Sequence, residues 1–300
     1  MNTTPELVLP ADDGTAGLSI GRSSIVGRLF ATPQGCIGGL IIAVIIAAAL
    51  CAPLIARYDP LQQDLSSGGI LQGVSGHHIL GTDDLGRDIF SRILYGGRIS
   101  LFIAGAAVAL AVVLGTALGT IAASAGDWWD VVIMRLMDAL LAFPVLVLAI
   151  ALSLAVGRGM LGLIVAVTVV NIPVFTRLTR AQVLHINTQQ YITAATAIGA
   201  GAFYKIRHHV IPNLVNALIV QATVALSFAI IIEAGLSFLG LGVQAPDPDW
   251  GVMISTAETF MIVAPHMMLA PAGAIFLTVL GLNLLGDALS DALDPRASHE

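Results

Sequence analysis

The sequence predicts an all-α membrane protein with six transmembrane helices. Its 300 residues are 57% hydrophobic and 11% charged, and the mean hydropathy is +0.90. A soluble domain carries roughly 25% charged residues, so much of this surface is expected to face lipid. The chain also contains six apolar runs close to the length of about 20 residues that a helix needs to cross a bilayer.

These six runs follow one another with short polar breaks or longer loops between them. They are expected to be the spanning helices, and a polar tail over residues 1–30 is expected to precede them. In chain order the runs are 35–56, 99–125, 139–156, 159–176, 214–232 and 267–286.

The distribution of basic residues predicts the orientation. Segment 177–213 has four Lys or Arg residues and no Asp or Glu. Short loops rich in Lys and Arg stay in the cytoplasm, so we expect this segment to be cytoplasmic. An even number of spans then places both chain ends in the cytoplasm and segments 57–98 and 239–266 outside.

Neither the cysteines nor the histidines predict a metal site. Cys36 and Cys51 lie in one apolar run, too far apart along a helix for a disulfide, and are interpreted as small apolar fillers. The adjacent histidines at 77–78 and 208–209 have no cysteine near them, and neighbouring side chains rarely converge on one metal without further ligands. We predict no metal ligand and no catalytic residue in this chain.

The chain also lacks a motif that binds nucleotide phosphates. A P-loop needs Gly-Lys followed by Ser or Thr, and the single lysine, Lys205, follows Tyr204. We therefore expect no cofactor on this chain and no nucleic-acid partner. Any energy from a nucleotide would have to come from another protein.

Four charged residues border or interrupt apolar runs: Arg135, Asp138, Glu233 and Asp287. Charges at membrane depth are costly and usually face a bundle interior, a cavity or the interface. Arg135 and Asp138 are three residues apart and could pair on one helix face. For Asp138 and Asp287 we favour a structural role, whereas for Glu233 a structural role and a place on a transport path both stay open.

The polar segment between the fourth and fifth runs predicts a short docking helix. Tyr191, Ala194, Ala195 and Ile198 recur at the spacing of one helical face, and Gly199 is expected to end the helix. A helix that lies on a membrane would need larger apolar residues on this face. A face made largely of alanine favours close approach to a groove on another protein.

At these residues the chain resembles the cytoplasmic "EAA" loop of bacterial ABC importer permeases. Thr193-Ala194-Ala195 matches the triplet, Gly199 the glycine, and Ile211-Pro212 the closing hydrophobic-proline pair. Thr193 stands where the family has glutamate, so a salt link from that position to an ATPase is not expected here. The resemblance implies that the matched residues, together with Tyr191 and Ile198, couple the chain to an ATPase.

Three further stretches resemble the second permease of dipeptide and oligopeptide importers. They are LGTDDLGRDIFSRILYGGRISL at 80–101, EAGLSFLGLGVQAPDPDWG at 233–251 and GLNLLGDALSDALDPR at 281–296. The resemblance implies an N-terminal helix joined to a five-helix type I permease core. The implied divisions are a cytoplasmic tail, 1–30; the first helix and the start of an external loop, 31–80; and the permease domain, 81–296, with a coupling loop at 177–213.

The resemblance also implies a place in an assembly. This chain would form half of a peptide pathway in the bacterial inner (plasma) membrane, beside a second homologous permease. One or two ATPase subunits would bind ATP and Mg²⁺, and an external binding protein would deliver the substrate. The alternatives are a permease for a nickel chelate, haem or another small solute, or a secondary transporter that uses Asp138, Glu233 and Asp287 as an ion relay.

Overall fold

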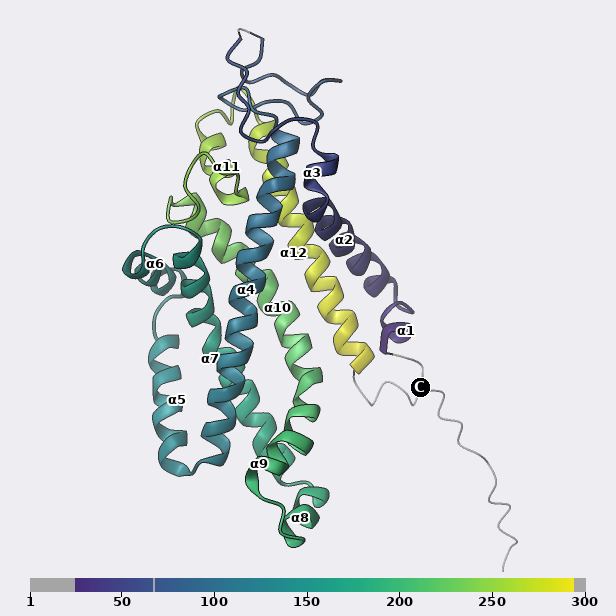
Figure 1. The fold of residues 1–300 in the computed structure, drawn as a ribbon, viewed down its shortest axis with the longest axis vertical. Helices are drawn as coiled ribbons and strands as arrows, with labels where there is room; N and C mark the ends of the chain where they lie inside the picture. The colour runs from purple at the N-terminus through teal and green to yellow at the C-terminus, as the bar shows by residue number, and fades with distance from the viewer. Residues whose placement is uncertain (1–24, 67, 294–300) are drawn as a thin grey trace, which may run out of the picture.

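The computed structural model describes residues 25–66 and 68–293, and these form a bundle of long helices (Figure 1). Most of the predicted 1–30 tail therefore lies outside the described residues. No strand occurs within the described ranges, only an isolated bridge between Thr82 and Asp88. The helices are α1 (Ile25–Leu29), α2 (Pro33–Leu50), α3 (Ala52–Ile55), α4 (Ile89–Ser124), α5 (Asp127–Leu141), α6 (Val145–Val156), α7 (Met160–Asn187), α8 (Gln190–Ala197), α9 (Ala202–Lys205), α10 (Ile211–Phe238), α11 (Trp250–Glu258) and α12 (His266–Leu293), with a π-helical turn at Ile206–Val210.

Five of the six predicted spans are confirmed as long apolar helices. Within the described residues, α2, α4, α7, the continuous helical segment Ala202–Phe238 and α12 are long and apolar enough to cross a membrane. The 36 residues of α4 extend well beyond its predicted run, because the segment before residue 99 continues the helix from an N-cap at Asp88. That cap is a side-chain oxygen that accepts a hydrogen bond from the Ser91 backbone N–H at 2.8 Å.

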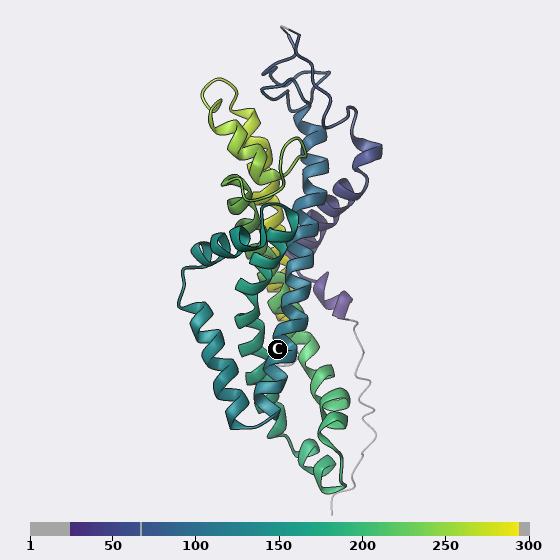
Figure 2. The ribbon, with the colours of Figure 1, turned by 60° about the vertical axis from the view of Figure 1, so that its left-hand side comes forward.

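The predicted third span, residues 139–156, is wrong as a single helix. Helix α5 ends at Leu141, α6 begins at Val145, and the two are bent by 99°. Pro144 stands at the break, where its ring disfavours a helical conformation for Phe143 and its nitrogen has no proton for a helical hydrogen bond. Only the bent pair taken together would make a sixth span, and Figure 2 shows α6 turned across the direction of α5.

Glycines allow a close contact between two of the long helices, α4 and α7. Gly115 and Gly119 of α4 face α7, and a Cβ atom on Gly115 would lie 2.5 Å from the Phe175 Cβ. On Gly119 it would lie 2.5 Å from the Thr176 carbonyl oxygen. Two small residues four apart let membrane helices approach at backbone distance. The pair α4–α7 therefore forms the centre of the bundle, with Phe175 fully buried in its core.

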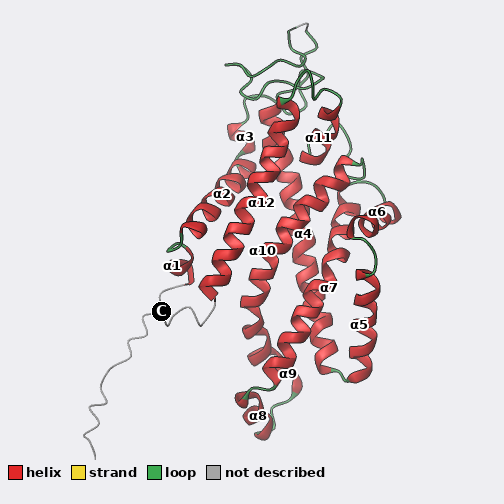
Figure 3. Ribbon diagram, turned by 180° about the vertical axis from the view of Figure 1, so that it is seen from behind, coloured by secondary structure: helices red, strands yellow, loops and turns green. Residues whose placement is uncertain are grey.

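The N-terminal helix joins the bundle through the C-terminal one. Gly38 of α2 lies against the backbone of α12, where an added Cβ would come within 2.7 Å of the Leu285 nitrogen. In Figures 1 and 3, α2 runs along α12 on the outside of the bundle. Helix α2 therefore packs on the outside of a core that is built from α4 to α12.

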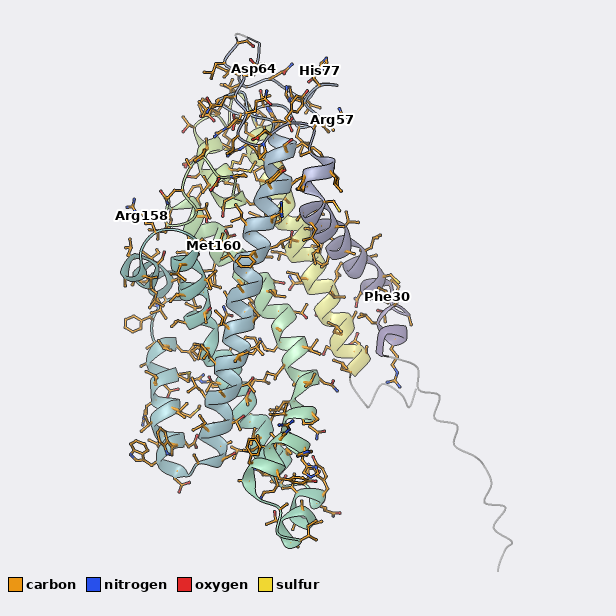
Figure 4. All side chains as sticks on the ribbon, viewed as in Figure 1. Phe30, Arg57, Asp64, His77, Arg158 and Met160 are labelled. Carbon is orange, nitrogen blue, oxygen red and sulfur yellow. The ribbon has the colours of Figure 1, made fainter. Side chains whose placement is uncertain are left out.

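The irregular segments gather at the two ends of the bundle. The connection 56–88 and α11 lie at one end, and α8 and α9 lie at the other (Figures 1 and 3). Arg57, Asp64 and His77 mark the first end in Figure 4, where polar side chains crowd the loops. The two polar segments predicted to lie on opposite sides of a membrane are therefore separated by the length of the helices.

Candidate functional site

Helix α8 is attached to the end of the bundle through Ile192, the larger of its two buried side chains. Ile192 packs in an apolar cluster with residues from the last turns of α7 and the start of α10. The other buried members of this cluster are Val183, Ile186, Val210 and Leu214. The cluster joins α8 to two long membrane helices at once.

The exposed face of α8 differs from the predicted face at one position. Tyr191 and Ala194 are exposed and Ile198 is 87% exposed, as a docking surface requires. Ala195, however, is buried. It follows Ile192 by three residues and so lies on the same side of the helix as that buried side chain. The prediction that Ala195 belongs to the outer face is wrong, because a face drawn from helical spacing alone cannot tell which neighbouring apolar residue turns inward.

The glycine that follows α8 ends the helix as predicted. Gly199 has a φ of +84°, in the left-handed region that L-residues with a side chain rarely adopt. Its N–H donates to the Thr196 carbonyl at 3.0 Å, and the Ala200 N–H donates to the Ala195 carbonyl at 2.9 Å. This pair of bonds is a Schellman motif, which satisfies the last carbonyls of the helix.

The predicted coupling loop 177–213 is mostly helical. Its first eleven residues continue α7, and its last residues, including the exposed Ile211 and Pro212, begin α10. Between these ends the sequence reasoning missed two exposed aromatic side chains, Phe203 and Tyr204; Phe203 is 75% exposed. The sequence feature that could have indicated their exposure is their position directly before the single lysine, Lys205, in a segment without acidic residues.

A cavity of about 390 Å³ separates α8 from the bundle end. Lys205 lines it and donates a hydrogen bond from Nζ to the Thr196 hydroxyl at 3.2 Å. Thr193, at the position of the family glutamate, also lines the cavity and so lies beside the chain's own α9. The cavity makes α8 a projecting element attached mainly through Ile192.

The two basic residues in the last half of α7 form ion pairs with α5. Arg177 contacts Asp138 at 2.5 Å, and Arg180 makes a two-pronged contact with Asp130. Asp138 therefore pairs across helices and not with Arg135, which is exposed, so the predicted pair within α5 is wrong. The spacing of residues within α5 cannot show that a basic residue of another helix, Arg177 of α7, lies beside Asp138.

The remaining two acidic candidates lie in contrasting environments. Asp287 of α12 is exposed, and none of the ion pairs among the described residues includes it. Glu233 of α10 is 0% exposed and lies 3.4 Å from the hydroxyls of Ser100 on α4 and Ser237. Asp138, Glu233 and Asp287 therefore belong to three separate local environments.

The motif around residues 80–101 forms a buried ion network at the opposite end. Asp83 accepts from Arg87 Nε at 2.6 Å and lies 3.5 Å from Arg92 Nε. Arg92 also donates to the Pro60 carbonyl at 3.0 Å. His78 Nδ1 contacts Asp88 at 2.8 Å. These contacts fasten the connection 56–88 to the first turn of α4.

Comparison with known proteins agrees with this arrangement. Residues 115–299 match the family described as the binding-protein-dependent transport system inner membrane component. Residues 24–72 match the N-terminal transmembrane domain of oligopeptide transport permease C. The second match covers α2, the helix that packs outside the core.

Similar proteins extend over most of the chain. The dipeptide transport system permease protein of Alkalihalophilus pseudofirmus is 44% identical over 87% of this chain and 85% of its own length. The glutathione transport system permease protein of Pectobacterium atrosepticum is 43% identical over 86% of this chain and 85% of its own length. The di/tripeptide transport system permease protein of Pseudomonas aeruginosa is 41% identical over 90% of this chain and 91% of its own length. With its family match across more than half of its residues, the chain belongs to the inner membrane components of binding-protein-dependent transport systems.

Proposed function

We propose that this chain is the permease subunit of an ATP-driven importer of short peptides. The observation that carries the proposal is the extended similarity to permeases named for dipeptides, di/tripeptides and glutathione. With a second homologous permease the chain would enclose the pathway, each contributing half. The chain itself performs alternating access, a change between two states that ATP on partner chains biases.

Helix α8 is the proposed coupling element. Its exposed residues Tyr191, Ala194 and Ile198 would contact an ATPase subunit, with Thr193 and the Ile211-Pro212 pair at the edges of the contact. Because Ile192 is packed against α7 and α10, a displacement of α8 would be passed to both helices. The ATPase would hold ATP and Mg²⁺, as one or two subunits per transporter.

The proposed orientation follows from this contact. The α8 end would face the cytoplasm of a bacterium, and both chain ends would be cytoplasmic. The opposite end, built from the connection 56–88 and α11, would receive the binding protein that carries the substrate. The proposed location is the inner membrane, with the exposed apolar side chains of α2 and other outer helices in contact with lipid.

The alternative of an ion-driven transporter loses its physical basis here. A relay needs groups that exchange a proton or ion in succession. Asp138 pairs with Arg177, Asp287 is exposed on α12, and Glu233 is enclosed among α4, α10 and the start of α11. No hydrogen bond or ion pair among the described residues joins one of these acids to another.

Reconstitution tests the proposal. The chain is placed in proteoliposomes with the permease, ATPases and binding protein encoded beside it, and uptake of a labelled dipeptide is measured with and without ATP. We expect uptake that requires ATP and every component. Uptake by the chain alone under an ion gradient would overturn the proposal, and ATP-driven uptake of a nickel chelate or haem in place of the peptide would overturn the substrate class.

A further inference from the structure

Glu233 and Asp249 are two buried carboxyl groups joined by one serine. Glu233 lies one turn before Ser237 in α10, and Asp249 immediately precedes α11. Both carboxyl residues are 0% exposed. The Ser237 hydroxyl lies 3.4 Å from Glu233 Oε1 and 3.3 Å from Asp249 Oδ2. A single hydroxyl thus connects a membrane helix to the start of a helix outside the spans.

Counting protons assigns the donor and acceptor roles at this serine. A serine hydroxyl has one proton, so Ser237 can donate to only one of the two carboxyls. Asp249 is placed as an acceptor, because its Oδ1 accepts from the backbone N–H groups of Gly251 at 2.8 Å and Val252 at 3.2 Å, at the N-terminus of α11. The contact between Ser237 and Glu233 is then a hydrogen bond only if Glu233 is the donor.

The surroundings of Glu233 agree with a neutral group. None of the ion pairs formed by the described residues includes Glu233 or Asp249. Two unpaired negative charges side by side at fully buried positions would be strongly unfavourable. Glu233 Oε2 is buried and has no hydrogen-bond partner among the described residues. Leaving this oxygen unpaired costs much less in a neutral carboxyl group than in a carboxylate.

Further contacts fix the same junction. A Cβ atom on Gly251 would lie 2.3 Å from the Ala234 carbonyl oxygen, so α11 approaches α10 at backbone distance. Trp250 Nε1 donates to the Ile93 carbonyl of α4 at 3.0 Å. Ser100 of α4 lies 3.4 Å from Glu233 Oε1. Helices α4, α10 and α11 therefore meet at the three hydrogen-bonded residues Glu233, Ser237 and Asp249.

We propose that Glu233 holds a proton and is a positioning residue for transport. Glu233 donates to Ser237, and Ser237 donates to Asp249. These two hydrogen bonds connect α11 to α10 at the end of the bundle opposite α8 (Figure 1). The proton keeps α11 moving together with α10 and α4. The effect on transport rests on the proposed function, whereas the protonation of Glu233 does not.

Infrared spectroscopy tests the protonation directly. The purified protein at neutral pH should show the C=O band of a protonated carboxyl group, and this band should disappear in Glu233→Gln. It should persist in the control Asp287→Asn, which removes an exposed carboxyl from α12. Absence of the band in the unaltered protein, or its survival in Glu233→Gln, would overturn the proposal.

Uptake by the assembled transporter tests the positioning role. Glu233→Gln keeps a donor of similar size and should stay within about twofold of the unaltered protein. Glu233→Leu should lose about tenfold, since it leaves the buried Ser237 hydroxyl without its donor. Equal loss in both variants, at equal amounts of inserted protein, would overturn the role. If Glu233→Leu does not accumulate, the infrared band and Glu233→Gln uptake decide. Uptake that fails even with the unaltered chain, while the band is present, refutes the peptide importer and leaves the proton in place.

Discussion

Ile192 of the short helix α8 is buried in the same apolar cluster as Leu214 of the long helix α10. Ile192 is the larger of the two buried side chains of α8, the other being Ala195, while Tyr191, Ala194 and Ile198 all face outward. A movement applied to α8 therefore reaches the membrane helices through Ile192.

Removing the attachment should uncouple the transporter. Ile192→Ala deletes a buried side chain, a change that typically costs 2–5 kcal/mol, roughly the whole local stability of so short a helix. We expect faster hydrogen exchange in α8 and ATP hydrolysis without matching uptake. Leu184→Ala, at an exposed leucine of α7, is the matched control. Unchanged exchange and uptake in Ile192→Ala would show that α8 is held by other contacts.

Adding bulk to the outer face should block the ATPase. Ala194 is exposed, so Ala194→Trp does not disturb packing within the chain, yet it prevents close approach of another protein. We expect a tenfold or greater loss of co-purified ATPase, equivalent to at least about 1.4 kcal/mol, with normal membrane insertion. Thr188→Trp, before α8, should be milder. The reverse order of the two variants would place the contact elsewhere.

The end of α8 should tolerate asparagine better than valine at position 199. Gly199 has open space around it but a φ of +84°, so the cost of a substitution comes from the backbone alone. A β-branched residue in this conformation costs on the order of 1–3 kcal/mol, whereas asparagine adopts it more readily. Uptake should decrease from the unaltered protein to Gly199→Asn and then to Gly199→Val. Equal uptake in all three would mean that the turn is not needed.

Asp138 should be dispensable for transport. Its ion pair with Arg177 is about half exposed, with both side chains at 49%, and pairs of this kind contribute about 0.2–1 kcal/mol. Asp138→Asn and Arg177→Gln should each leave ATP-driven uptake within about twofold, because neither removes a buried contact. A complete loss of uptake in Asp138→Asn, with normal insertion, would return this acid to a transport path.

Labelling of single cysteines checks the orientation. In a variant with Cys36 and Cys51 replaced by alanine, Ser66→Cys should react with a charged reagent in intact cells. Thr188→Cys should react only after permeabilisation. Both positions are exposed. Ser66 belongs to the connection 56–88 and Thr188 lies between α7 and α8, and these two segments are at opposite ends of the bundle (Figure 1). Labelling of Thr188→Cys in intact cells would invert the proposed topology.

The sequence by itself determined that the described residues are almost wholly helical, it placed five of the six predicted spans, and it identified Gly199 as the residue that ends α8. These features depend on local chemistry: uninterrupted apolar runs, and a glycine where the backbone turns left-handed. The sequence also contained the cause of its one wrong span. Pro144 lies inside the run 139–156, and hydropathy averaged over that run outweighed the helix break that a proline introduces.

Only the tertiary structure decided which partners the buried and charged side chains meet. Asp138 pairs with Arg177, 39 positions away. Ala195 is buried together with Ile192, the side chain of α8 that packs against residues of α7 and α10. Glu233 meets Ser100 across 133 positions, a contact created by the packing of α4 on α10. Helical periodicity orders residues around one helix. It does not say which side another helix will cover, and that choice determines which carboxyl group must keep its proton.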